Sequence, residues 1–117
     1  MQIPEITLKD MENIKNYLSK LDQYKEAMKN KYIPILSQAK TYWQLKNMYE
    51  RQLEKLVKKK SELEDEKEKI KRQLSKNPEL ITESKKLTIE IDKTTQEILG
   101  LGLAFGEVRK QIFSKPK

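Results

Sequence analysis

The sequence predicts an all-α fold: a three-helix antiparallel bundle with a projecting two-helix antiparallel coiled-coil arm. Charged residues make up 37 % of the 117 residues and hydrophobic residues 36 %, with three glycines and four prolines, which is typical of long amphipathic helices. Apolar residues recur with a heptad period, and one seam of that period is apolar from Ile14 to Ile70. Two proline-containing segments interrupt the pattern, so we expect one helical domain, 1–117, built from three helices.

The first helix is expected over about 7–31. Thr7 fits the N-cap position and Asp10 the third helical position of a capping box, while Ile6 and Met11 fit a hydrophobic staple. Pro34 lacks a backbone N–H and restricts the residue before it, so we expect a break within the segment 30–34.

The second helix is expected over about 34–75 and the third over about 79–113, with a turn at 75–78. Asn77 is a good N-cap residue and Pro78 a good first helical residue. In an antiparallel hairpin the numbers of paired residues add to a constant, and a value of 154 places an apolar residue opposite an apolar residue along most of the seam. This register pairs Leu74 with Leu80, Leu63 with Ile91, Leu56 with Ile98, Leu53 with Leu101, Tyr49 with Phe105 and Tyr42 with Ile112.

Additional apolar positions distinguish a bundle body from an arm. The second helix is widely apolar between residues 33 and 57, and the third helix widens in parallel; a wide stripe indicates contact with two neighbours. We therefore expect the first helix to lie beside both, giving a body of 7–57 and 92–113 and an arm of 58–92. The additional positions are Leu36, Trp43, Leu45, Met48, Val57, Leu99, Leu103 and Phe113.

Three glycines, Gly100, Gly102 and Gly106, lie inside the third helix, where each costs about 1 kcal/mol relative to alanine. One interpretation is close approach of a bulky ring or a neighbouring backbone; a second is a local helix break. The third interpretation is a groove or dimer seam at Gly102 and Gly106. Trp43 is expected to be buried between helices, and if exposed it becomes a candidate anchor for a protein partner.

Basic residues gather near the turn between the second and third helices. The segment 51–77 holds ten basic and six acidic residues in a chain of net charge +7. The alternatives are a solvated lysine-rich surface, a phosphate-binding surface for nucleic acid, and a surface for an acidic protein. Scarce arginine and the lack of aromatic residues at the tip argue against nucleic acid. The candidate contacts are Lys67, Lys69, Lys71, Arg72, Lys76, Lys85 and Lys86.

The composition also excludes several kinds of site. Without cysteine or histidine there is no disulfide, thiolate nucleophile, Cys/His metal site or histidine base. The acidic run 62–68 is explained by ion pairs within a helix, so we expect no metal and no cofactor. No apolar run is long enough to span a membrane, and we expect a cytoplasmic protein.

The expected function is that of a non-enzymatic interaction or adaptor protein, a small subunit or regulator in a larger assembly. Its expected partners are other proteins or further copies of this chain. The alternative function is association with nucleic acid through the basic arm.

Overall fold

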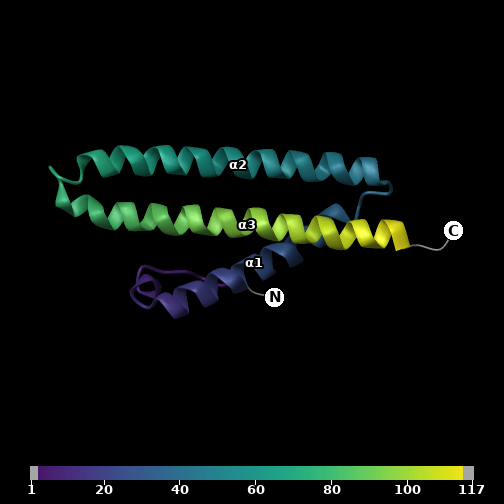
Figure 1. The fold of residues 1–117 in the computed structure, drawn as a ribbon, viewed down its shortest axis with the longest axis horizontal. Helices are drawn as coiled ribbons and strands as arrows, with labels where there is room; N and C mark the ends of the chain where they lie inside the picture. Colours follow the sequence, from purple (N-terminus) through teal and green to yellow (C-terminus); the bar gives the residue numbers. More distant parts are fainter. Residues whose placement is uncertain (1–2, 115–117) are drawn as a thin grey trace.

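The computed structural model describes residues 3–114, and every regular element in this part of the chain is a helix, with no strand (Figure 1). Three long α-helices account for most of it, and two short 3-10 turns precede the first and third helices. The elements are η1 (Asp10–Glu12), α1 (Ile14–Leu36), α2 (Tyr42–Gln73), η2 (Pro78–Leu80) and α3 (Ile81–Ser114).

Helices α2 and α3 lie side by side and run in opposite directions, which makes the molecule 65 Å long (Figure 1). The predicted pairing of Tyr49 with Phe105 is confirmed, because their ring centroids lie 4.6 Å apart. At the connecting turn, Pro78 occupies the first position of η2, as predicted. Asn77 precedes it as the N-cap residue, but its side chain makes no capping hydrogen bond.

Helix α1 slants across α3, runs in the same direction as α3, and touches α2 only sparingly (Figure 1). The first helix was expected beside both other helices; it packs mainly on α3 and reaches α2 near its C-terminal end. Near its C-terminal end, Leu36 joins a core cluster with Leu45 of α2 and Leu101 of α3. Towards its N-terminal end, Tyr17 and Met28 belong to a second cluster that also contains Ile89 of α3.

The predicted break at 30–34 is wrong, since Pro34 lies inside α1 and the helix continues to Leu36. Pro34 sits in the last turn, and the chain leaves the helix after it, where the Ser37 N–H donates to the Ile33 carbonyl at 2.8 Å. Burial of Leu36, which is fully enclosed, offsets the penalty for a proline at this position. Helix α2 consequently begins at Tyr42 rather than near residue 34.

The N-terminal segment contains the predicted Thr7–Asp10 motif, but the motif closes η1 rather than α1. The Asp10 carboxylate accepts from the Thr7 N–H at 2.7 Å and pairs with Lys20 at 2.9 Å. These bonds, led by the one from the Thr7 backbone, lower the pKa of Asp10 to about 2. Helix α1 itself is capped by Asn13, whose side chain accepts from the Asn16 N–H.

The same N-terminal segment covers part of the predicted arm. Ile6 is buried in the cluster that contains Ile89. Leu8 lies together with Thr82 and Lys85 of α3 around a shallow pocket. One side of α3 within residues 82–90 therefore packs against the N-terminal segment.

Candidate functional site

The three glycines of α3 have different surroundings. A β carbon added to Gly100 would lie 2.6 Å from the Lys25 carbonyl oxygen and 2.8 Å from the Met28 Cβ. Close approach of a neighbouring backbone therefore explains Gly100, where α1 crosses α3. A β carbon on Gly102 would lie 4.0 Å from the Tyr49 hydroxyl, and one on Gly106 would have no neighbour within 4 Å among the described residues. Helix α3 is continuous through all three, so the interpretation as a helix break is wrong.

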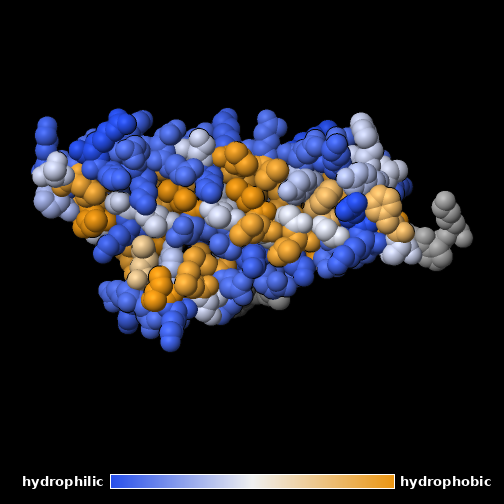
Figure 2. All heavy atoms as spheres, viewed as in Figure 1, coloured by the Kyte–Doolittle hydropathy of each residue, from blue (hydrophilic) through white to orange (hydrophobic). Residues whose placement is uncertain are grey.

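Around Gly106, the outer face of α3 carries large apolar side chains in contact with water. Leu99 is 48 % exposed, Leu103 45 % and Phe113 65 %. Their spacing places them on one side of the helix together with Gly106 and Lys110. We call this set the α3 stripe: Leu99, Leu103, Gly106, Lys110 and Phe113. Figure 2 shows apolar atoms along α3 and onto α2 on the viewed face.

The C-terminal end of the α3 stripe combines aromatic rings with positive charge. The Arg109 guanidinium lies 5.8 Å from the centre of the Tyr42 ring and 5.6 Å from that of Phe113. An open pocket of about 410 Å³ is lined by Gly106, Arg109, Lys110 and Phe113. This end of α3 thus offers an apolar surface bordered by two basic side chains.

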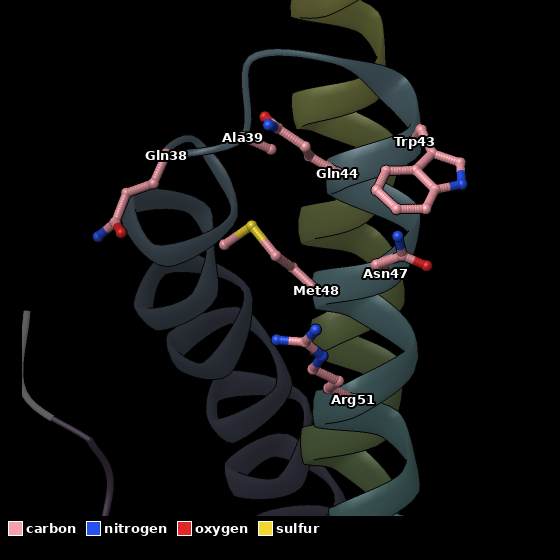
Figure 3. Close-up of a pocket in the computed structure, with 7 residues that line it drawn as sticks. All are labelled: Gln38, Ala39, Trp43, Gln44, Asn47, Met48 and Arg51. Atoms are coloured by element: carbon pink, nitrogen blue, oxygen red, sulfur yellow. The ribbon is translucent and has the colours of Figure 1, made fainter.

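Trp43 is 72 % exposed, so the prediction that it is buried between helices is wrong. Because α1 slants away from α2, no helix covers the side of α2 on which the indole lies. Figure 3 shows Met48 and Arg51 extending towards α1, while the Trp43 indole extends from the other side of α2. Together with neighbouring polar residues, these side chains line an open pocket of about 370 Å³.

The predicted basic contacts lie around one end of the molecule, on the last turns of α2, the connecting turn and the first turns of α3 (Figure 1). Arg72 approaches Glu68 at 3.9 Å, which partly neutralises it. Lys67 is half-buried, and the following six are exposed: Lys69, Lys71, Arg72, Lys76, Lys85 and Lys86. The structure brings these residues to one end of the α2–α3 pair.

A polar junction between α1 and α3 was not anticipated from the sequence. The buried Tyr32 hydroxyl donates to the Glu97 carboxylate at 2.5 Å, and Tyr17 donates to Asp92 at the same distance. Lys31 also approaches Glu97, at 3.8 Å. The available signal was the spacing of Tyr17, Tyr24 and Tyr32 on one side of α1, together with the acidic residues Asp92 and Glu97 of α3.

Burial of the tyrosines perturbs their titration. Burial raises the pKa of Tyr24 to about 12, with smaller contributions from the Glu97 and Glu90 charges. Burial, and then the hydrogen bond to a carboxylate, also raises the pKa values of Tyr17 and Tyr32. All three hydroxyls stay protonated at neutral pH, and those of Tyr17 and Tyr32 act as donors that hold α1 on α3.

Within residues 3–114, no group of three or more acidic, cysteine or histidine side chains is arranged to hold a metal ion. None of the helices in this range is both long and apolar enough to cross a membrane. Comparison of the chain with protein-family models, with curated proteins and with solved structures finds no match.

Proposed function

We propose that this protein is a non-enzymatic helical interaction module, a small subunit or regulator of a larger protein assembly. The observation that supports this proposal is the α3 stripe, in which Leu99, Leu103 and Phe113 lie exposed on one helix face. Contiguous apolar surface on a water-exposed face is typical of a binding site for another protein. Exposed Trp43 adds a second candidate anchor, since tryptophan and arginine are enriched among residues that dominate binding energy.

The long α2–α3 pair suits this function. We propose that its turn-proximal half acts as an antiparallel coiled-coil arm that separates the apolar surface near Gly106 from the basic end at Lys76. Such an arm would hold two partners, or two parts of one partner, at a defined distance.

The experiment is affinity purification of the full chain from its native host, with the co-purified proteins quantified by mass spectrometry. The parent is compared with Leu103→Glu, which places a charge in the α3 stripe, and with Ser61→Glu, which adds the same charge at an exposed position on α2. We expect specific partners to be lost with Leu103→Glu and retained with Ser61→Glu. Recovery of the same proteins with both variants would contradict a role for the stripe.

The second candidate function is association with nucleic acid through the basic end. It is favoured by the exposure of Lys69, Lys71, Arg72 and Lys76, whose charges are available to phosphates. The two candidates differ in their response to salt, because phosphate contacts release counterions and apolar helix contacts do not.

A further inference from the structure

We propose that the α3 stripe binds a second copy of this chain, and that the two α3 helices pair in antiparallel orientation about a two-fold axis near Leu101. This proposal rests on the proposed function, because it uses the same surface, and it names the occupant. The inference begins from the spacing of the exposed face. Asp92, Gln96 and Leu99, then Leu103, Gly106 and Lys110 follow one another at alternating intervals of four and three residues, which is the heptad spacing of a helix-pairing seam.

The apolar centre of the seam lies on the side of α3 that is open in the single chain, whereas Asp92 and Gln96 are partly buried. Leu101, Ala104 and Val108 are buried against the other helices, whereas Leu99 and Leu103 remain exposed. The position of Gly106 is also open, because an added β carbon there would meet no atom within 4 Å in the described part of the chain.

The seam is complementary to itself in one register. When paired residue numbers add to 202, Leu99 faces Leu103 of the second copy, and the two-fold axis repeats this contact. In the same register Asp92 faces Lys110 of the second copy, so opposite charges meet at both ends of the apolar centre. Lys110 is exposed and has no carboxylate partner within residues 3–114, while Asp92 accepts only a neutral Tyr17 hydroxyl there.

Gly106 has a role at this contact that it does not have in the single chain. Gly106 faces Gln96 of the second copy in this register, and the missing side chain leaves room for the longer one. Gly100 differs, because packing of α1 within one chain already requires a glycine there. The pairing therefore gives a reason for a helix-interior glycine at which a β carbon would meet no neighbour in the described part of the single chain.

The size of the contact sets the expected strength. Residues 92–110 of an α-helix span roughly 28 Å. A single helix pair of this length is smaller than the standard protein interface of about 1,600 Å². We therefore expect a dimer with a dissociation constant in the micromolar range, about 1–100 µM.

Sedimentation equilibrium of the full chain across that range tests the proposal. We expect the parent to change from monomer to dimer, Leu103→Lys to weaken association at least tenfold, and Val57→Lys, which makes the same kind of change at an exposed apolar side chain on α2, to leave it unchanged. Lys110→Asp should weaken association and Lys110→Arg should retain it; circular dichroism checks that each variant is folded. A parent that stays monomeric, or a dimer that survives Leu103→Lys, would overturn the proposal.

Disulfide crosslinking tests the register, because the chain contains no natural cysteine. An equimolar mixture of Leu99→Cys and Leu103→Cys chains should form a mixed disulfide more efficiently than either chain forms one alone. Equal crosslinking in all three samples would contradict the register.

A monomer that still captures a different protein through the α3 stripe would contradict this proposal and leave the proposed function standing. A dimer that captures no other protein would support this proposal and contradict the proposed function.

Discussion

Gly100 of α3 lies directly against the backbone of α1 at Lys25. A β carbon on Gly100 would come within 2.6 Å of the Lys25 carbonyl oxygen and within 2.9 Å of the Lys29 nitrogen. Both neighbours are backbone atoms, so they cannot move aside as the end of a flexible side chain can. The distance between α1 and α3 at their crossing point therefore depends on glycine.

Gly100→Ala should destabilise the fold by about 1–3 kcal/mol, because α1 must shift to admit the methyl group. This loss should exceed the gain in helix propensity. Gly106→Ala is the matched control: the same substitution in the same helix meets no neighbour and should stabilise by about 0.5–1 kcal/mol. Urea unfolding of dilute protein measures both, and a stabilising Gly100→Ala would show that the helices are farther apart than described.

Tyr32→Phe should destabilise by about 1–3 kcal/mol, because it leaves the buried Glu97 carboxylate without its hydroxyl donor. Lys31, at 3.8 Å, is too distant to replace that bond. Tyr49→Phe is the control, because it removes the same hydroxyl from a tyrosine whose ring packs on Phe105. Equal free energies of unfolding for the two variants would contradict a structural role for the Tyr32–Glu97 bond.

Stability should decline in alkaline solution. The pKa of Tyr24 is raised to about 12 in the folded protein, and those of Tyr17 and Tyr32 are raised as well, against about 10 in the unfolded chain. A pKa that is raised in the folded state favours the protonated tyrosine. The contribution of the tyrosines to the free energy of unfolding is therefore complete below pH 10 and is lost as the pH rises towards and past 12. Urea unfolding between pH 8 and about 12 should show this decline.

A variant carrying both Tyr17→Phe and Tyr32→Phe separates this effect from lysine titration, because it retains every lysine. Its decline above pH 10 should be shallower than that of the parent. Parallel curves for the two proteins would show that the tyrosines do not carry the alkaline dependence.

Trp43→Ala should change the free energy of unfolding by less than about 1 kcal/mol, because the indole is mostly in water and leaves no cavity. The tryptophan fluorescence of the folded protein should resemble that of the unfolded chain in its emission maximum. A loss of about 3–5 kcal/mol, the usual result for a buried aromatic side chain, would mean that the indole is enclosed.

If the basic end binds nucleic acid, replacing Lys69, Lys71, Arg72 and Lys76 with glutamine should weaken binding and reduce the slope of log affinity against log salt by up to about 3–4. Folding should change little, since these side chains are exposed. Glutamine at Lys9, Lys15, Lys40 and Lys46 removes the same charge elsewhere and provides the control. A parent protein that does not bind at low salt would exclude this function.

Heptad spacing identified the all-helical class and the Tyr49–Phe105 pairing, because a long seam allows few registers. It could not identify the partner of α1, which depends on Gly100 and on tyrosine–carboxylate bonds between residues far apart in the chain. The local preference of Pro34 predicts a break, but it does not include the burial of Leu36. The position of Trp43 beside the Tyr42 and Tyr49 seam predicts burial, but the slant of α1 leaves that side of α2 uncovered.

The packing of α1 on α3 has a consequence for biosynthesis. The ribosome makes α1 first and α3 last, and 75 positions separate Tyr17 from its partner Asp92. Until residues 81–114 emerge, the buried side of α1 has no surface to cover it. Contacts this distant along the chain slow folding relative to helical proteins built from neighbouring segments. A nascent chain halted before α3 would therefore present two uncovered apolar helices to chaperones and proteases.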